Sequence, residues 1–315
     1  MNMSKLLVVC GPTTTGKTSL GLKMAQKFNG EIISADSRQV YAGMDIVTGK
    51  DLPPAVTSQV SNLSWQGRFL KYYEIEKIKV WGYDLVNPDQ DFNVSFWNEC
   101  AKILISDIRS RGKLPIIVGG TGLYLKSLTV SMPDIDIPQN PDLRLSLKDK
   151  SADDLLDYLS LLDFARAQQL NSSDRKNPRR LIRAIEISQF KLSGGVSASQ
   201  PKAPTDVFSI CLTAPIQFLK SRIDQKISQR IAAGAFFEAQ NLLATFPPDL
   251  SSLSACGYRA FCNPDWESSW SRSEHQYLKR QLTWFKKQPN LFWCDISTDS
   301  WSDLCFSAVT NWYNN

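Results

Sequence analysis

The stretch Gly11–Thr18, GPTTTGKT, has residue types and a spacing that suit the binding of phosphate groups. It fits the pattern G-x-x-x-x-G-K-[ST], in which glycines turn backbone N–H groups toward phosphate oxygens, a lysine adds a full charge, and the last hydroxyl suits Mg²⁺. The loop follows the apolar run LLVVC and opens a helical pattern, so a plain strand-to-helix turn is the weaker interpretation. The residues expected to hold the phosphates are Gly11, Pro12, Thr13, Thr14, Thr15, Gly16, Lys17 and Thr18, with Thr18 also on the metal.

The loop alone does not identify the molecule that carries the phosphates. A typical P-loop NTPase has a second apolar strand that ends in an aspartate, which helps to hold magnesium. Here the stretch IIVGGTGLY has Gly-Gly-Thr at that point, and the acid that follows a strand in this region is Asp36. The sequence therefore supports a phosphate-binding site, and it does not support an enzyme that hydrolyses nucleoside triphosphates.

The elements that must position these residues alternate between strand and helix. Asp36 and Thr121 each follow a predicted strand, so both should point into the crevice at the carboxyl ends of a parallel sheet. We expect an α/β fold of the P-loop NTPase type, with a parallel sheet and helices on both faces. Residues 42–93 give no firm assignment beyond a candidate strand at KYYEI. The predicted strands and helices of this half are Leu6–Cys10, Lys17–Phe28, Glu31–Asp36, Val94–Arg111 and Pro115–Gly120.

The pattern changes after Val130, where a proline-broken acidic stretch is followed by helical segments such as DDLLDYLSLLDF and NPRRLIRAIEISQF. A strand-like segment returns at Val207–Thr213, followed by two long helical stretches and a last strand at LFWCDI. We therefore predict a catalytic core of residues 1–130 and 207–315, interrupted by a helical insertion domain of residues 131–206.

Composition limits the possible classes of protein. The 315 residues suit about two domains, and the 43% hydrophobic content and net charge of +5 are typical of a soluble globular protein. No apolar run approaches the length of a membrane span, so we expect a cytoplasmic protein with no membrane partner. Seven scattered cysteines without a C-x-x-C pair and a single histidine argue against a zinc site and multi-histidine chemistry.

Seven motifs follow one another along the chain: GPTTTGKT, ADSRQVYAGMDI, IVGGTGLYLKSL, NPRRLIRAIE, LKSRIDQKISQRI, ACGYR and LKRQLTWFKK. They occur in the order found in tRNA dimethylallyltransferases, and the chain resembles that family over nearly its whole length. The family attaches a dimethylallyl group from dimethylallyl diphosphate to N6 of the adenosine 3′-adjacent to the anticodon in tRNA, releasing pyrophosphate. The resemblance implies that the loop binds the diphosphate with Mg²⁺, and that the partner is a tRNA anticodon stem-loop. We expect a monomer of the bacterial type, which has no zinc-finger tail.

The resemblance implies catalytic roles for Lys17, Thr18, Asp36, Thr121 and Arg259. An exocyclic adenine amine is a weak nucleophile, so a carboxylate must accept its proton as the new bond forms. Asp36 is the candidate base, with a helix cap and a magnesium ligand as its alternatives. Lys17, Thr18 and Arg259 would neutralise the leaving pyrophosphate. Thr121 would hydrogen-bond the flipped base or the diphosphate, a turn residue being its alternative.

Basic clusters predict the RNA surface. Arg179 and Arg183 are four residues apart near the start of a helix, for which Asn177 and Pro178 suit the N-cap and N1 positions. Cations there oppose the helix dipole, so an anionic partner is a reasonable explanation, although a solvated basic face is the commoner one for such a run. The matching segment NPRRLIRAIE of the family implies RNA contact here. The resemblance implies that Ser37, Arg38 and Gln39 contact the target base. The expected tRNA contacts are Asp36, Ser37, Arg38, Gln39, Thr121, Arg144, Arg179, Arg180, Arg183, Lys279 and Arg280.

The sequence departs from the family in two segments. Val47–Lys50, VTGK, replaces the usual Gly-Thr-Ala-Lys, and Trp81–Val86, WGYDLV, replaces an element with two histidines. The local fold of the second segment is left open. Two other hypotheses remain at this stage. One is an adenylate isopentenyltransferase or a P-loop small-molecule kinase, which would not need the basic insertion. The other is an RNA-binding protein that has lost catalysis.

Overall fold

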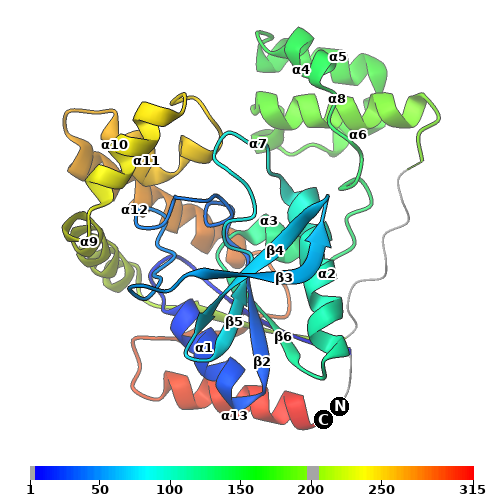
Figure 1. Ribbon diagram of the computed structural model, residues 1–315. Coiled ribbons are helices and arrows are strands. Elements are labelled where there is room, and N and C mark those ends of the chain that lie inside the picture. Colours follow the sequence, from blue (N-terminus) through cyan, green and yellow to red (C-terminus); the bar gives the residue numbers. More distant parts are fainter. Residues whose placement is uncertain (1–3, 197–205) are drawn as a thin grey trace. The chain divides into compact units, whose positions relative to one another are not determined.

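The computed structural model describes residues 4–196 and 206–315, and the chain divides into two compact units (Figure 1). Unit 1 comprises Met1–Val130 and Ala203–Asn315, and unit 2 comprises Ser131–Lys202. Unit 2 thus covers the predicted insertion as far as Lys202, and the residues that flank it in the sequence belong to one body.

Unit 1 is built on a sheet whose described strands follow the order β3-β4-β5-β2-β6-β1-β7-β8. Neighbours from β5 to β8 pair in parallel, while β3 with β4 and β4 with β5 pair antiparallel. The predicted α/β class is confirmed, and an antiparallel edge is added to it. The strands are β1 (Lys5–Cys10), β2 (Gly30–Ser34), β3 (Ser58–Trp65), β4 (Arg68–Ile75), β5 (Ile78–Trp81), β6 (Leu114–Gly119), β7 (Asp206–Thr213) and β8 (Phe292–Asp295).

The central strands are apolar because helices cover both faces of the sheet. Every residue of β1, β2 and β6 is buried, which is the pattern of parallel strands. Leu6 and Val8 of β1 face a core shared with α2 and α3, whereas Leu7 and Val9 face a core shared with α1 and α13. Figure 1 shows α1 and α13 together on their side of the sheet. These helices are α1 (Lys17–Lys27), α2 (Val94–Ser110), α3 (Gly122–Thr129) and α13 (Trp301–Asn314).

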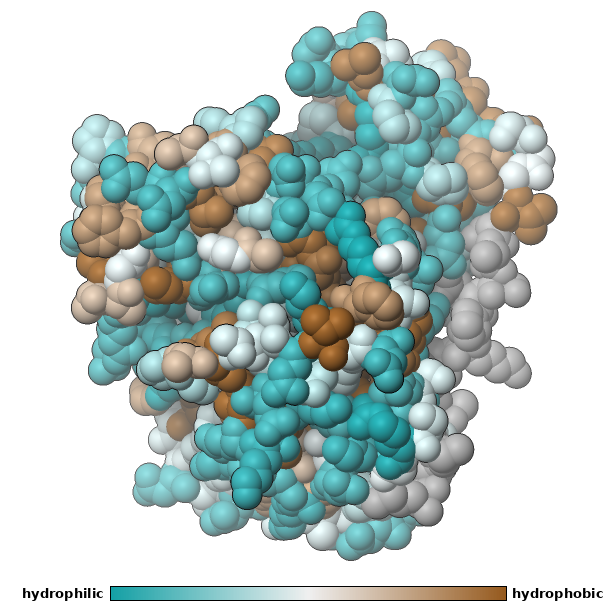
Figure 2. Space-filling view, viewed as in Figure 1, coloured by the Kyte–Doolittle hydropathy of each residue, from teal (hydrophilic) through white to brown (hydrophobic). Residues whose placement is uncertain are grey.

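Four further helices of unit 1 lie between β7 and β8 in the sequence. They are α9 (Ile216–Ala232), α10 (Ala235–Thr245), α11 (Cys256–Phe261) and α12 (Trp266–Phe285). α12 packs against α9, α11 and α3, and it begins seven residues before the predicted start at Ser273. Phe236 and Phe237 of α10 are exposed, and Figure 2 shows hydrophobic side chains over α10 and α11 on a largely hydrophilic face.

The segment that the sequence left unassigned holds the antiparallel edge. Of β3, β4 and β5, the sequence indicated only part of β4, at KYYEI. The turns that join these strands use left-handed residues, Gln66-Gly67 and Glu76-Lys77. The second pair lacks the glycine or asparagine that usually marks such a turn, which hid the hairpin.

The regular elements of unit 2 are all helices among its described residues, as predicted. Its core holds Leu155, Leu159, Leu181 and Ile185. The helices are α4 (Pro141–Leu147), α5 (Ala152–Leu162), α6 (Phe164–Gln169), α7 (Ser172–Arg175) and α8 (Pro178–Leu192). The predicted start of α8 is confirmed, because the Asn177 side chain caps the helix and a proline follows at N1. Within residues 4–196 and 206–315, no helix has the length and apolar character needed to cross a bilayer.

Candidate active site

The predicted phosphate loop joins β1 to α1 in a conformation that its glycines permit. Gly11 has a φ of 136°, and a Cβ atom there would lie 2.4 Å from the carbonyl oxygen of Leu212 in β7. Any other residue at this position would therefore push two strands apart. Gly16, with a φ of 85°, precedes the first helical residue, so the N-terminal amides of α1 are directed at the loop. The Thr15 hydroxyl donates to the Pro12 carbonyl at 2.9 Å and braces the turn.

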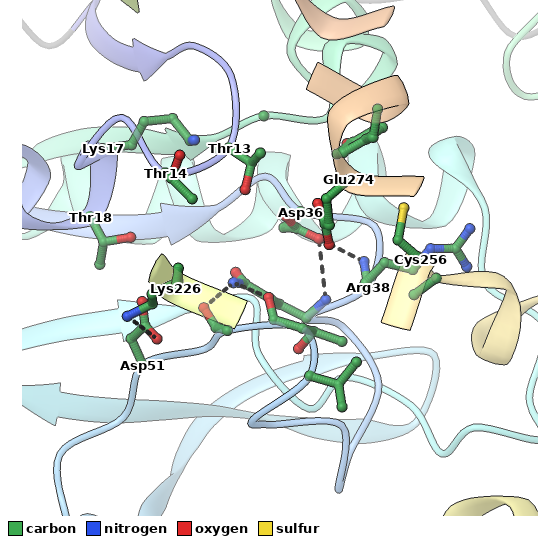
Figure 3. Close-up of a pocket in the computed structure, with 18 of the residues that line it drawn as sticks. Thr13, Thr14, Lys17, Thr18, Asp36, Arg38, Asp51, Lys226, Cys256 and Glu274 are labelled. Atoms are coloured by element: carbon green, nitrogen blue, oxygen red, sulfur yellow. Dashed lines mark hydrogen bonds and ion pairs between the residues drawn. The ribbon is translucent and has the colours of Figure 1, made fainter. Parts of the chain in front are cut away.

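A cavity of about 540 Å³ lies over this loop, between the carboxyl ends of the central strands and the helices α9 and α12 (Figure 3). This volume is in the range of small-molecule sites. Most of the loop residues predicted to bind phosphate line the cavity, whereas Gly11, Pro12 and Thr15 shape the turn behind it. The loop residues on its wall are Thr13, Thr14, Gly16, Lys17 and Thr18.

The loop presents cationic and unpartnered polar groups to the cavity. Burial lowers the pKa of Lys17 to about 8, and the nearby Asp36 carboxylate opposes part of that shift. The Lys17 ammonium donates to the Pro12 carbonyl at 2.6 Å. The Thr14 hydroxyl and the Arg230 Nε are buried and have no hydrogen-bond partner among the described residues. Buried polar groups without partners are rare in folded proteins, so both atoms point to a ligand.

Helix α9 supplies cations that sequence reasoning missed. Arg222, Lys226 and Arg230 are spaced by four residues and all line the cavity. The Arg222 Nε donates to the Thr14 carbonyl at 2.9 Å, and the Arg230 guanidinium donates to the Val47 carbonyl at 3.2 Å. The spacing of four places them on one helix face and could have shown them as a basic stripe.

Asp36 lies on the cavity wall just past β2, as predicted. Its Oδ1 accepts hydrogen bonds from the backbone N–H groups of Arg38 at 2.8 Å and Gln39 at 3.4 Å. No described residue donates to Oδ2, so one carboxylate oxygen is fixed by the chain and the other remains available to a ligand.

Two polar residues hold the strand ends around Asp36. The Thr121 hydroxyl accepts from the Ser37 backbone N–H at 3.0 Å, which places Thr121 behind the segment after β2 and off the cavity wall. Gln281 of α12 was not foreseen. Its carbonyl oxygen accepts from the Thr13 N–H at 2.9 Å, and its amide donates to the Gly120 carbonyl at 3.1 Å. Gln281 therefore ties the phosphate loop to the end of β6.

A second carboxyl group, that of Glu274 in α12, lines the cavity with Asp36 (Figure 3). Burial raises its pKa, and the charge of Asp36 adds to that shift. Arg230 and a hydrogen bond from Trp270 Nε1, at 3.3 Å, act in the opposite direction. Nothing in the sequence marked Glu274, because it lies among polar residues of an ordinary helical pattern.

Arg259 requires a correction. Its side chain is exposed on α11 and does not line the cavity, so the expectation that it neutralises the diphosphate is not met. The rotation of this short helix explains the difference. Cys256 and Gly257 line the cavity, and Tyr258 is buried with its hydroxyl donating to Glu238 at 2.6 Å. Arg259 is thereby turned outward, and α9 supplies the cations instead.

The expected base-contacting segment lies at the cavity, although part of it is engaged within the protein. Ser37, Arg38 and Gln39 all line the cavity. The Arg38 guanidinium donates to the Ser254 hydroxyl at 2.9 Å, and the Gln39 amide donates to the Gly49 carbonyl at 2.8 Å. Gln39 thus fixes the neighbouring segment, while Ser37 keeps its side chain at the cavity.

The segment Asp45–Lys50 is clamped from two sides. Glu238 of α10 accepts from the backbone N–H groups of Asp45 at 2.9 Å and Val47 at 2.9 Å. The buried Lys50 ammonium is paired with Asp45, at 2.6 Å, and with Asp84. Asp84 belongs to the segment Trp81–Val86, whose first residue ends β5, and it supplies an ion-pair partner for Lys50. The altered segment is therefore folded into unit 1, and Tyr83 within it lines the cavity.

The basic residues of unit 2 divide into partly exposed residues that pair with a buried carboxylate and residues that are exposed. Arg144 makes a two-pronged contact with the buried Glu186, at 2.6 and 2.9 Å, and Arg183 contacts Glu186 at 3.2 Å. Arg183 also donates to the Ile137 carbonyl at 2.7 Å. Burial alone would raise the pKa of Glu186, but these hydrogen bonds outweigh it and lower the pKa. Arg144 and Arg183, both predicted to contact tRNA, thus already use guanidinium donors within the protein and are only partly exposed.

The other predicted RNA contacts are exposed. Arg180 pairs with Asp174, and Arg179 has no ion-pair partner among the described residues. On α12, Lys279 is exposed outside the cavity lining, whereas Arg280 lines the cavity with its guanidinium 5.6 Å from the ring centre of Tyr277.

Comparison with known proteins places this geometry in context. Residues 70–288 match the model of the family described as IPP transferase, and residues 4–61 match that described as isopentenyl transferase. A tRNA dimethylallyltransferase of Pediococcus pentosaceus is 34% identical, with 98% of this chain and 97% of the relative covered. A tRNA dimethylallyltransferase of Roseiflexus sp. is 32% identical, with 98% of this chain and 99% of the relative covered. The crystal structure of a tRNA isopentenylpyrophosphate transferase from Bacillus halodurans superposes on this chain with a TM-score of 0.67. The two sequences are 30% identical, and 99% of this chain and 96% of the other are covered.

Proposed function

The chain belongs to the IPP transferase family of tRNA dimethylallyltransferases, and we propose that its cavity joins dimethylallyl diphosphate to tRNA. It is a prenyl transferase that acts on tRNA. The product is the N6-dimethylallyl form of the adenosine 3′-adjacent to the anticodon, and the second product is pyrophosphate. One observation supports this chemistry most directly: Asp36 and the phosphate loop line the same cavity.

The leaving group fits the end of the cavity formed by the loop and α9. As the C–O bond of the donor breaks, both electrons go to the diphosphate, whose growing charge must be neutralised. Lys17, Arg222, Lys226 and Arg230 all line this cavity. The unpartnered Thr14 hydroxyl and Arg230 Nε supply two further donors. These groups replace Arg259 as the electrostatic partners of the pyrophosphate.

The donor set also fits a magnesium ion that arrives with the diphosphate. No group of three or more His, Cys, Asp or Glu side chains that could cage a metal occurs in residues 4–196 and 206–315. Mg²⁺ needs no such cage, because it often combines one or two protein oxygens with phosphate oxygens and water. The Thr18 hydroxyl lines the cavity and would hold it. Bound there, the ion would withdraw charge from the leaving pyrophosphate.

The acceptor side is built around Asp36. The N6 amine attacks the allylic carbon, a C–N bond forms as the C–O bond breaks, and one N6 proton must leave. With Oδ1 held by two backbone N–H groups, the Asp36 carboxylate keeps Oδ2 for that proton. Ser37, Arg38 and the Thr121-supported turn hold this carboxylate in place.

The basic residues of the insertion that remain exposed are the proposed tRNA phosphate contacts. Arg179 and Lys176 have exposed side chains near the start of α8, and Arg180 is exposed beside its partner Asp174. Since the residues that line the cavity all come from unit 1 of one chain, we propose that a monomer is active and that it works in the cytoplasm, where its tRNA substrate is made.

A single reaction tests the proposal. The protein is incubated with Mg²⁺, dimethylallyl diphosphate and an unmodified tRNA anticodon stem-loop, and the RNA is analysed by mass spectrometry. We expect one dimethylallyl unit in place of one hydrogen on the adenosine after the anticodon, and pyrophosphate in equal amount. The matched control is a stem-loop with guanosine at that position, which should stay unmodified. An unchanged adenosine stem-loop would reject the proposal, and phosphate transfer from ATP would replace it with a kinase.

A further inference from the structure

Three carboxyl groups line the described cavity, and one of them, Asp51, is not explained by the chemistry at Asp36. Figure 3 shows Asp51 on the same side of the view as Thr18, away from Asp36 and Glu274. The contacts along α9 support that placement. Arg222 contacts the loop at Thr14, and one helical turn later Lys226 contacts the Asp51 carboxylate at 3.1 Å. Asp51 therefore lies toward the diphosphate end of the cavity.

The backbone presents this carboxylate in an uncommon way. Asp51 has a φ of 51°, in the left-handed region that few residues other than glycine adopt. The residue before it, Lys50, has a fully buried side chain that donates to the Tyr41 carbonyl at 2.9 Å and pairs with Asp45 and Asp84. The Asp51 side chain itself is 51% exposed. The fold thus fixes the chain up to Lys50 and leaves the next carboxylate accessible from the cavity.

The other two carboxyl groups are poorly suited to a metal ion. Asp36 has Oδ1 committed to two backbone N–H groups, and the proposed function assigns its Oδ2 to the N6 proton. Glu274 receives the Trp270 indole N–H, and burial favours its neutral form. A magnesium ion prefers ionised oxygen ligands and tolerates several bound waters. Asp51 is the accessible carboxylate that meets this requirement.

We propose that Asp51 holds the Mg²⁺ that accompanies the diphosphate, together with Thr18, and that Lys226 exchanges Asp51 for a phosphate oxygen when the complex forms. In the free protein, the ion pair neutralises both side chains. In the complex, each gains a partner of opposite charge, Mg²⁺ for Asp51 and phosphate for Lys226. The inference rests on the proposed function, because the metal enters with the diphosphate donor.

Metal linkage of ligand binding provides the test. The ligand is an unreactive thiolo analogue of dimethylallyl diphosphate, and its dissociation constant is measured by calorimetry with saturating Mg²⁺ and with EDTA. The dissociation constant in EDTA divided by that in Mg²⁺ measures the coupling between metal and diphosphate binding. In the wild-type protein, Mg²⁺ should tighten binding. Asp51→Asn should reduce that ratio by about tenfold or more, as expected for loss of a metal-supporting group.

Lys226→Gln is the matched control, because it breaks the same ion pair and leaves the carboxylate. It should weaken analogue binding with and without metal, and keep the wild-type ratio. Thermal unfolding of both variants checks that the fold is intact. An unchanged ratio in Asp51→Asn, or an equal reduction in both variants, would overturn the assignment of Asp51 alone. A wild-type protein that shows no metal dependence would reject the magnesium site itself, and one that does not bind the analogue would reject the proposed donor.

Discussion

The lowered pKa of Lys17 leads to a prediction about how diphosphate binding depends on pH. Burial brings this pKa to about 8, although the nearby Asp36 carboxylate opposes the shift. For a cation with a lowered pKa, the charge is present below that value and is lost above it. One pH unit higher, about one-tenth of the free protein retains the charge, so affinity for a diphosphate should fall about tenfold per pH unit above 8. This corresponds to about 1.4 kcal/mol of binding free energy per unit.

The assay is a titration of the thiolo analogue of dimethylallyl diphosphate at a series of values from about pH 7 to 9.5, over which an organic diphosphate, with a last ionisation near pH 6, keeps a constant charge. Lys17→Arg is the control, because a guanidinium stays protonated throughout this range and its affinity should be flat. A constant affinity in the wild-type protein would refute the reasoning, as would an equal decline in the arginine variant, since the titrating group would then lie elsewhere.

Three further outcomes follow from the contacts of individual side chains. Arg222→Gln should weaken analogue binding by about tenfold or more, because a charged hydrogen bond is lost. Arg259→Gln should change it by less than about twofold. If Arg259→Gln had the larger effect, Arg259 would be the residue that binds the diphosphate. Arg179→Gln should lower the slope of log Kd for tRNA against log salt concentration by about one unit. Arg183→Gln should instead lower the thermal unfolding midpoint. Equal effects of both variants on the slope would contradict the structural role of Arg183. Lys50→Met should destabilise the protein to urea by about 3–5 kcal/mol, because carboxylates lose their buried partner, and a cost below about 1 kcal/mol would show that the ion pair contributes little.

The features that the sequence revealed are those specified by neighbouring residues. The phosphate loop is local, since the positive φ values of Gly11 and Gly16 belong to the backbone between one strand and the helix that follows it. The start of α8 is local as well, because Asn177 and Pro178 act within the first turn. Asp36 was found because the end of a parallel strand places it at the sheet edge.

The features that the sequence missed depend on contacts between distant residues. Arg222 reaches the loop at Thr14 across 208 positions, and Gln281 reaches Thr13 across 268. The spacing of four along α9 marks a basic stripe, but no local pattern shows that this stripe reaches the loop. The same limit explains Arg183, whose position on a basic helix face suggested RNA, although the Ile137 carbonyl and Glu186 take up its guanidinium. Spacing identified the helix face, and tertiary packing decided which cations stay exposed.

The most direct test of the mechanism is the single-turnover rate of Asp36→Asn with dimethylallyl diphosphate, Mg²⁺ and the anticodon stem-loop. Asparagine keeps the shape of the side chain and can still accept the Arg38 N–H, but it cannot take the N6 proton. The rate should fall by about 10²–10⁴-fold, with the affinities for both substrates changed by less than about tenfold. A rate close to that of the wild-type protein would contradict the assignment of Asp36 as the base. A loss confined to diphosphate binding and restored by high Mg²⁺ would assign Asp36 to the metal instead.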